Sequence, residues 1–591
     1  MASGTRYSSQ ELKASGAKEH LLPVTLIALS AALFTLPVLV HGFWPFSWDA
    51  RLHTNWFYHF CQQFWNGELY PRWLSGMNEG LGSPVFFYYP PLPYWITSLL
   101  RPLIPDDPAG WRGLGVSCYL ALTISGLGCY FWIRQLTPRM PALVTAILFM
   151  FMPYHLRTDL YVRGAFAEFW SFAWLPWILF FIERVAKGGA WPPLGIALSY
   201  AALVTTHLPT TLIFSLVPVS YAVLLAKRSA NLKVLKVTVP GMALGIGLAS
   251  IYLIPAMTMQ RHATMEVMTR DLYYANSFFF SDSGFQTWNF HDDFKLQMLL
   301  LTLATMATAL AAAFIANKDR TLRWQVCFWA AVLVISFFMM LPASNVIWKV
   351  IPTVQMIQFP WRFNTVLCVA AAPLIALGVM SLKRPLSTRS FIFAQAGYAS
   401  VIASLYLTIV PVWKDHLVPR HDASLAVPNT IDAPEYKPRD VTIDRSDVIQ
   451  KAGRIGRGQE LLLSGSKDGQ VTYAAPRVIR LKPDTHTNGL PFVIRQFYYF
   501  GWAALIDGKP SAVNASKPDG LIEITLPAGA RELTLTLLPQ APERVGKAIS
   551  AMSLLVAGLL AICIALQNHV RSRKNKELVP KEVPSEAESG R

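Results

Sequence analysis

Charged side chains gather at a few points of this sequence, and each point lies beside a long apolar run. Asp49 follows the first apolar run and His53 is close behind it, Arg163 and Glu168 stand together between two runs, and Arg362 begins another. A carboxylate can take a proton from an incoming hydroxyl group, and arginine binds phosphate through paired hydrogen bonds. These residue types suit a transfer reaction on a phosphate substrate whose apolar part stays in a membrane.

Further residues extend this candidate site. Arg72 is a third arginine that could bind the phosphate group. Aromatic rings stack on the faces of sugars and histidines can donate hydrogen bonds, so four more residues are candidates for substrate binding. They are His53, Tyr88, Tyr89 and His207.

The same residues also fit purely structural roles. Asp49 can cap a helix, Glu168 can complement a helix N-terminus, and His207 beside a proline can serve a turn. Arg163 and Arg362 can extend toward the membrane interface. The structural roles explain each residue singly, but they explain less easily why the residues collect on one side of the membrane.

Composition defines the class of protein. The 591 residues are 53% hydrophobic and only 15% charged, whereas soluble proteins carry about 25% charged residues. Apolar runs of the length that spans a bilayer, about 20 residues, occur repeatedly. The run at 21–42 has no small-residue cleavage site and is interpreted as a retained helix. The six cysteines are scattered, which indicates neither a disulfide framework nor a metal site.

The distribution of Lys and Arg predicts the topology. Further apolar runs occupy 111–133, 140–156, 166–183, 190–206, 208–226, 235–257, 297–316, 323–341, 361–381, 389–412 and 547–567. Alternate connections are rich in Lys and Arg, which marks cytoplasmic loops. About 12 transmembrane helices with both termini in the cytoplasm satisfy this pattern, provided that 43–110 is one long external loop.

The stretch from Leu69 to Leu92 lies within that external loop. It combines prolines and glycines with aromatic rings and carries only two charges, Arg72 and Glu79. Broken backbone is tolerated at membrane depth where protein or a cavity covers it, so we expect this stretch to cover a cleft that faces the lipid. Tyr88 and Tyr89 could face a sugar there, or they could belong to an interfacial aromatic belt.

The domain organisation follows from these assignments. We expect a cytoplasmic N-terminus at 1–20, a transmembrane domain at 21–412, an external β-rich domain at 413–546, a last transmembrane helix at 547–567 and a cytoplasmic tail at 568–591. Alternating apolar and polar residues and the hairpin signal Asp507-Gly508 predict that the external domain is a β-sandwich. The formal net charge of +17 lies mostly in cytoplasmic loops, so it gives no indication of nucleic-acid binding.

An ordered set of short motifs resembles a known family. The motifs are "NGELYPRW" (66–73), "GLGSPVFFYYPPL" (80–92), "YVRGAFAEF" (161–169), "THLP" (206–209), "QFPWRF" (358–363), "EYKP" (435–438) and "FYYFGWAALIDGKP" (497–510), together with Asp49 after the first helix. The chain resembles the bacterial membrane proteins labelled "6-pyruvoyl-tetrahydropterin synthase-related" and, less closely, YfhO-like proteins. The histidine cluster of the soluble, zinc-dependent pterin synthase is not seen in this sequence.

The resemblance implies the GT-C superfamily of membrane glycosyltransferases. In that superfamily an acidic residue of the first external loop acts as the base or positions the acceptor, and Asp49 matches it. The family often has an acidic pair there, but Ala50 follows Asp49. The second catalytic carboxylate is therefore left to Glu168 or Glu79.

The resemblance also implies the substrates and the location. The donor would be a polyprenyl-phosphate-linked sugar, and the acceptor an envelope glycan, lipid or protein outside the bacterial inner membrane, with inversion at the anomeric carbon. No cofactor is expected and no metal ligand set is evident, although metal use varies in the superfamily, so a divalent metal stays open. Two alternatives are a transporter or flippase of lipid-linked sugars and a non-catalytic envelope-assembly protein.

Overall fold

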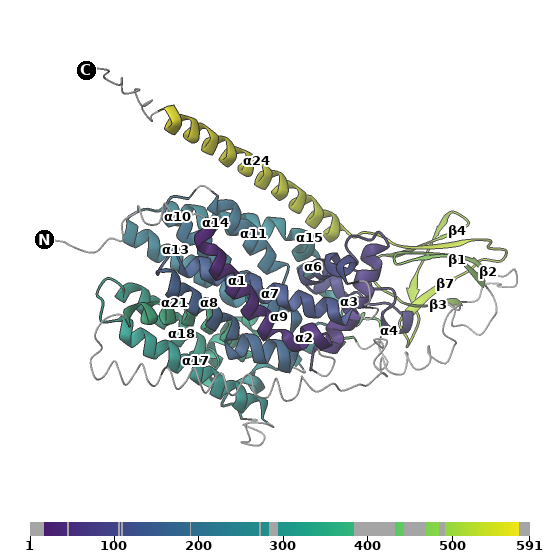
Figure 1. Cartoon of the computed structure of the whole chain (residues 1–591). Coiled ribbons are helices and arrows are strands. Elements are labelled where there is room, and N and C mark those ends of the chain that lie inside the picture. Colours follow the sequence, from purple (N-terminus) through teal and green to yellow (C-terminus); the bar gives the residue numbers. More distant parts are fainter. Residues whose placement is uncertain are drawn as a thin grey trace, which may run out of the picture.

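The computed structural model describes residues 17–43, 47–104, 107, 110–189, 191–270, 273–282, 293–382, 397, 432–441, 469–483 and 491–577. A large helical part makes up most of the molecule, and a smaller β-region lies at one of its ends (Figure 1). The short helices that follow the first apolar run lie between these two parts. The long last helix starts at the β-region and runs back along the helical part.

The first helices are α1 (Ala17–Phe34), α2 (Leu36–His41), α3 (Ala50–Trp65), α4 (Met77–Gly80), α5 (Val85–Tyr88), α6 (Leu92–Leu100), α7 (Trp111–Ile133), α8 (Arg139–Phe151), α9 (Phe166–Ser171), α10 (Leu175–Ala186) and α11 (Pro192–Val204). They are followed by α12 (Leu208–Phe214), α13 (Leu216–Ser229), α14 (Lys233–Leu248), α15 (Ser250–Thr258), α16 (Val267–Arg270), α17 (Phe294–Ala316), α18 (Arg323–Phe338), α19 (Asn345–Val350), α20 (Pro352–Gln355), α21 (Asn364–Ser381) and α24 (Ala541–Glu577).

Short helical turns connect several of these elements. They are the 3₁₀ turns η1 (Arg101–Leu103), η3 (Gln260–His262), η4 (Tyr274–Ser277), η5 (Pro342–Ser344), η6 (Pro360–Phe363) and η8 (Pro434–Tyr436). The segment η2 (Tyr154–Arg163) is a π-helix that continues α8. Such wider turns are frequent at functional sites.

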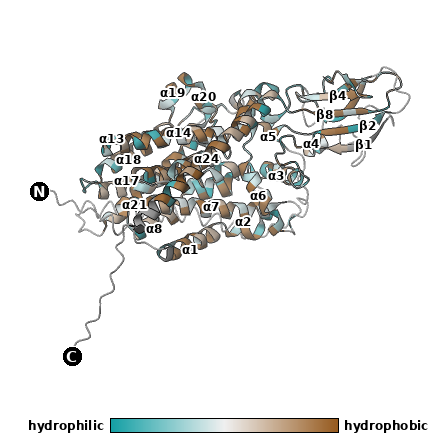
Figure 2. Cartoon of the chain, turned by 90° about the horizontal axis from the view of Figure 1, so that it is seen from above, coloured by the Kyte–Doolittle hydropathy of each residue, from teal (hydrophilic) through white to brown (hydrophobic). Residues whose placement is uncertain are grey.

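The helical part is a multi-pass membrane domain. Within the described residues, seven helical stretches are long and apolar enough to cross a membrane, and nine if two bent pairs each count as one span. The stretches are Trp111–Ile133, Arg139–Arg163, Phe166–Ala186, Leu208–Ser229, Phe294–Ala316, Pro360–Ser381 and Ala541–Val570. Figure 2 shows that most of the helical part is hydrophobic, whereas the strands carry both colours.

The prediction of about twelve spans is confirmed only in part, as a membrane protein with seven to nine candidate spans in the described residues. The runs predicted at 21–42 and 190–206 contain shorter apolar helices, Glu19–Phe34 and Pro192–Val204. The run predicted at 389–412 lies outside the described residues except for Gly397. The number twelve and the placement of both termini in the cytoplasm stay predictions.

One predicted span is bent. The run at 235–257 forms α14 and α15, which meet at an angle of 73°. The carbonyls of Gly247 and Leu248 at the bend accept hydrogen bonds from Ser550 Oγ of α24 at 3.2 and 2.9 Å, and the same oxygen accepts from Ile251 N at 2.7 Å. Backbone groups that the bend releases are therefore satisfied by another helix, as a buried backbone requires.

The β-region consists of two antiparallel sheets. Its strands are β1 (Gly469–Ala475), β2 (Val478–Pro483), β3 (Pro491–Phe497), β4 (Trp502–Ile506), β5 (Lys509–Ser511), β6 (Asn514–Ala515), β7 (Leu521–Thr525) and β8 (Leu533–Leu537). One sheet has the order β1-β2-β8-β4-β5 and the other β3-β7-β6. Ile506 pairs with Lys509 across Asp507-Gly508, so the predicted hairpin is confirmed.

The stretch Leu69–Leu92 packs between the two parts of the molecule. Leu74 pairs with Ser83, and Leu81 O accepts a hydrogen bond from Phe497 N at 2.7 Å, at the end of β3. Gly82 has φ of +87° and lies so close to the Trp73 ring that a Cβ atom would collide with it. The glycines and rings thus form a compact layer beneath the β-region.

Candidate active site

A cavity of about 610 Å³ lies where the first loop, η2, α12, α15 and η6 meet. One group of lining residues is apolar and includes Leu212, Leu253, Met257 and Met356. A second group is charged or polar and includes Asp49, His53, Arg163, His207, Arg362 and Glu435, with several tyrosines. The cavity can therefore contact an amphipathic molecule along both of its parts.

Asp49 is held at the start of α3. Its backbone N–H donates to the carbonyl of Arg163 at 2.7 Å, and its own carbonyl accepts from His53 N at 3.1 Å. The carboxylate lies 3.7 Å from Nη2 of Arg163, and its side chain keeps 39% exposure. Burial in the surrounding protein raises the pKa of Asp49 above its ordinary value, while Arg163 and Arg362 oppose that rise.

Arg163 is placed by the end of the π-helix η2. Gly164 follows with φ of +62° and turns the chain, and Ala165 N closes the turn by donating to Asp159 O at 2.7 Å. Nη1 of Arg163 contacts Asp159 Oδ1 at 3.0 Å and Glu168 Oε2 at 2.8 Å. One buried guanidinium thus joins three carboxylates, including Asp49.

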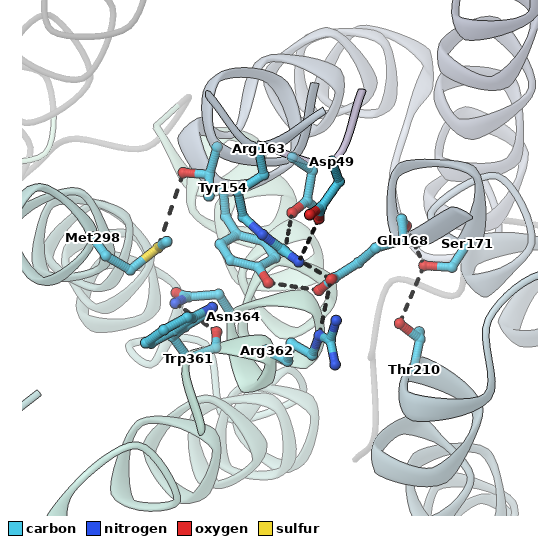
Figure 3. A network of polar contacts seen from close by, with 12 residues as sticks. Asp49, Tyr154, Arg163, Glu168, Ser171, Thr210, Met298, Trp361, Arg362 and Asn364 are labelled. Carbon is cyan, nitrogen blue, oxygen red and sulfur yellow. Dashed lines mark hydrogen bonds and ion pairs between the residues drawn. The ribbon is translucent and has the colours of Figure 1, made fainter. Parts of the chain in front are cut away.

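Glu168 lies behind the arginines and is not among the residues that line the cavity. Its carboxylate accepts from Tyr154 Oη at 2.6 Å and also contacts Arg362 Nε at 3.1 Å. Figure 3 shows Glu168 between the guanidinium groups of Arg163 and Arg362. A carboxylate with these contacts can hold both arginines in place. The alternative second carboxylate, Glu79, is also absent from the lining.

Arg362 has one nitrogen left for a ligand. Its Nη1 donates to Ile357 O at 2.6 Å and to Gln358 Oε1 at 2.9 Å, and Nε serves Glu168. No residue in the described part of the chain accepts a hydrogen bond from Nη2. Because Arg362 lines the cavity, this nitrogen can serve an anionic group there.

The two histidines that line the cavity are neutral near pH 7. Burial lowers the pKa of both His53 and His207 to about 3. His207 precedes α12, and its Nδ1 lies 2.8 Å from Thr210 Oγ1 and 3.4 Å from Thr210 N. In the tautomer in which Nδ1 accepts from Thr210 N, Nε2 carries the proton. His53 Nδ1 lies 2.6 Å from Tyr94 Oη. His207 therefore offers a neutral N–H donor.

Tyr88 and Tyr89 both line the cavity, as the sequence predicts for substrate-binding residues. The Tyr88 hydroxyl donates to Met259 O at 2.9 Å and lies 3.0 Å from Tyr499 Oη of the β-region. The Tyr89 ring packs against Trp56 with 4.8 Å between centroids. The hydroxyl group of Tyr88 is engaged in these contacts within the protein. Tyr88 can therefore contact a ligand mainly through its ring.

Arg72 lies outside the cavity lining. Its Nη1 forms an ion pair with Glu543 at 3.2 Å at the start of α24, and Nη2 donates to Ile251 O at 2.8 Å in α15. The guanidinium also lies over the Tyr70 ring, 3.9 Å from its centroid. These contacts fasten the first loop to two helices and do not face the cavity.

Glu435 is a lining residue that the candidate set from the sequence omits. It belongs to residues 432–441, which we call the strap, and "EYKP" is among the motifs that carry the family resemblance. The motif marks this segment in the sequence, but it does not predict that the Glu435 side chain points into the cavity. Among the described residues, no group of three or more His, Cys, Asp or Glu side chains could hold a metal ion.

A family model for the 6-pyruvoyl-tetrahydropterin synthase related domain, described as a membrane protein, matches residues 86–414, which is more than half of the chain. The chain belongs to this family. The match includes Arg163, Glu168, His207 and Arg362 and precedes the strap. None of the curated proteins matches the sequence of this family member.

Solved structures show distant similarity. The arabinofuranosyltransferase AftD from Mycobacteria superposes with a TM-score of 0.43 at 16% identity, over 67% of this chain and 27% of that one. The oligosaccharyltransferase AglB from Archaeoglobus fulgidus, in complex with an inhibitory peptide and a dolichol-phosphate, gives 0.41 at 14% identity, over 68% and 56%. The family member therefore spans less than two thirds of either chain.

Proposed function

We propose that this family member is an inverting glycosyltransferase of the GT-C type, which moves a sugar from a polyprenyl-phosphate donor to a cell-envelope acceptor. One observation carries the proposal: a single cavity joins an apolar wall to a carboxylate and an arginine nitrogen, Nη2 of Arg362, for which the described residues provide no acceptor. A lipid-linked sugar phosphate has the same division between an apolar chain and an anionic group.

The donor phosphate would bind at Arg362, whose Nη2 is directed to no protein acceptor in the described part of the chain. Arg163 would add positive charge beside it, and Glu168 would fix both guanidiniums without touching substrate. The lipid chain would follow the apolar wall at Leu212 and Met257. Arg72 is not assigned to the phosphate, because its guanidinium forms an ion pair with Glu543 outside the cavity.

The sugar would occupy the space between the phosphate and the acceptor. Tyr88 and Tyr89 would present ring faces to it, and His207 would donate through Nε2 to a hydroxyl or phosphate oxygen. His53 would support this wall through its contact with Tyr94. Neutral histidines suit this role because they add hydrogen-bond donors without a further charge.

Asp49 would contact the acceptor hydroxyl group. The acceptor oxygen attacks the anomeric carbon, the bond between that carbon and the phosphate oxygen breaks, and its electron pair leaves with the polyprenyl phosphate. The hydroxyl proton passes to a carboxylate of the site. Attack from the face opposite to the phosphate inverts the anomeric configuration, and the step needs no cofactor.

The location follows from the charge pattern of the loops. The cavity would face the periplasm of a bacterial inner membrane, where envelope glycans, lipids or proteins are the acceptors. Both termini would lie in the cytoplasm.

Envelope glycans test this proposal. They would be compared by mass spectrometry in strains that carry the wild-type protein, no protein, Asp49→Asn, or the control Asp282→Asn at matched membrane abundance. Asp282 is exposed and does not line the cavity. We expect one sugar to disappear in the deletion and Asp49→Asn strains and to persist in the control.

Two other results would contradict this function. If deletion leaves the envelope glycans unchanged, the protein is not the proposed glycosyltransferase. A sugar that is lost on deletion but restored fully by Asp49→Asn would favour transport of lipid-linked sugars or an assembly role instead.

A further inference from the structure

The strap is fixed to the membrane domain at both of its ends. At one end Asp432 Oδ1 accepts a hydrogen bond from Trp56 Nε1 of α3 at 2.9 Å. At the other end Pro438 pairs with Ala263, and Arg439 forms an ion pair with Glu266 at 2.8 Å. A segment held at two points this way presents the residues between them in a defined direction.

The middle of the strap contributes to the cavity. Tyr436 is buried and stacks on Tyr88, with 6.3 Å between ring centroids and an angle of 12°. Glu435 precedes it, is partly exposed and lines the same cavity as Asp49 and Arg362. No other side chain in the described part of the protein forms a hydrogen bond or ion pair with the Glu435 carboxylate. Glu435 is therefore a carboxylate available to a ligand.

Asp49 and Glu435 differ in their neighbours. Asp49 lies 3.7 Å from a guanidinium nitrogen, and this cation offsets part of the rise that burial gives to the pKa of the Asp49 carboxyl group. Burial raises the pKa of Glu435 to about 7; its own backbone N–H and Arg362 oppose this rise, while Asp432 and Asp49 add to it. The other titratable or charged residues of the cavity wall are His53, Arg163, His207 and the tyrosines Tyr88, Tyr89, Tyr200, Tyr252 and Tyr436.

We propose that Glu435 accepts the proton of the acceptor hydroxyl, while Asp49 orients that hydroxyl through a hydrogen bond. This inference rests on the proposed glycosyl transfer. The acceptor oxygen forms its bond to the anomeric carbon, the bond from that carbon to the phosphate oxygen breaks, and the proton moves to Glu435. The electron pair departs with the lipid phosphate, and Glu435 later releases its proton to water.

The proton affinity of Glu435 can be measured without any substrate. Infrared spectra of the full chain in lipid nanodiscs, recorded across a pH titration, report the C=O band of protonated carboxyl groups. We expect a band that titrates near pH 7 in the wild-type protein and is missing in Glu435→Gln. The control Glu532→Gln, at an exposed position of the β-region outside the cavity lining, should keep the band. Asp49→Asn should move this titration to lower pH, because it removes a neighbouring negative charge.

Two infrared results would overturn the assignment. One is a wild-type spectrum without any band lost in Glu435→Gln. The other is a Glu435 band that titrates at the ordinary value for glutamate, about 4.3. Unfolding by SDS checks that Glu435→Gln is folded, and Glu435→Asp provides a second variant that keeps a carboxylate.

The glycan comparison then tests the role in transfer. A general base contributes about 100-fold or more, so Glu435→Gln should reduce incorporation of the sugar about 100-fold. Glu435→Asp should restore part of it, and the control Glu532→Gln should lose none. If deletion and Asp49→Asn remove the sugar but Glu435→Gln keeps it, the role of Glu435 is wrong and the transferase stands. If deletion changes nothing, the transferase function itself is wrong.

Discussion

Asp49 and Arg163 meet through both backbone and side chain. The backbone N–H of Asp49 donates to the carbonyl of Arg163 at 2.7 Å, and their charged groups lie 3.7 Å apart. The backbone contact fixes the position of α3 against the end of η2, so the charged contact is a consequence of the fold. Substitutions that disturb this contact between α3 and η2 should therefore lower stability, whereas substitutions of cavity side chains should lower activity.

Removal of the Arg163 guanidinium should be costly. Arg163→Leu would leave the carboxylates of Asp159 and Glu168 buried without this partner, and breaking a buried ion pair from one side costs about 3–5 kcal/mol. SDS-induced unfolding in mixed micelles would measure the loss. Arg531→Leu in the exposed part of the β-region is the control and should change the unfolding free energy little. Equal effects of the two variants would contradict the structural role of Arg163.

Gly164 provides a test of the same junction through the backbone. A Cβ atom there would lie 2.7 Å from Ala50 Cβ and would also meet Ser47 Oγ. Gly164→Ala should therefore destabilise the protein by about 3 kcal/mol, since strain at positive φ and overpacking add together. Gly188 has φ of +80° with no neighbour of its Cβ position within 4 Å, so Gly188→Ala isolates the backbone strain of about 1 kcal/mol. Similar losses of unfolding free energy in the two variants would show that the space beside Ala50 can hold a methyl group.

Arg362→Lys tests phosphate binding. Lysine keeps the charge but cannot serve Glu168, Ile357 and a ligand at once, because it lacks the planar fork of arginine. We expect binding of polyprenyl phosphate in nanodiscs to weaken about tenfold, the loss of roughly one hydrogen bond to a charged group. Arg134→Lys, at a position outside the cavity lining, should leave the affinity unchanged. An unchanged affinity in Arg362→Lys would place the phosphate elsewhere.

His207→Asn separates capping from ligand contact. Asparagine is a good N-cap residue, so the variant should unfold at the SDS concentration of the wild type, yet it lacks the Nε2–H group and should incorporate less sugar. The lowered pKa of His207, about 3, keeps the imidazole neutral at every pH above that value. Activity between pH 5 and 8 should therefore carry no contribution from its protonation, and a pH dependence that disappears in His207→Asn would contradict this.

The sequence predicted the helical membrane character and the β-rich region, and seven of its nine candidate site residues line the cavity. Apolar runs reveal helices because burial in lipid demands length and hydrophobicity, and the motif around Arg362 marks a helix start. The bend between α14 and α15 was not predicted, because it depends on Ser550, which lies about 300 positions later. Hydropathy carries no information on such distant hydrogen bonds.

The limits of prediction for individual side chains have a similar cause. Arg72 and Arg362 both lie beside aromatic and proline residues in the sequence. Arg72, however, forms an ion pair with Glu543 and does not line the cavity. Glu168 was a candidate for catalysis, but it lies behind the two arginines it contacts. Glu435 was overlooked because its position depends on anchors in α3 and beside η3. For Arg72, for Glu435 and for the contact of Glu168 with Arg362, the deciding partner is remote along the chain.

The strap comes late in the sequence relative to the other residues that line the cavity. A nascent chain that has not yet reached Asp432 already contains Asp49, Arg163, His207 and Arg362, but it lacks the segment that joins Trp56 to the region of Glu266. In the proposed function, such a translation intermediate would contain the phosphate-binding residues but would lack Glu435. In the proposed transfer, the proton acceptor would therefore be delivered by the ribosome only after the helices that form the cavity.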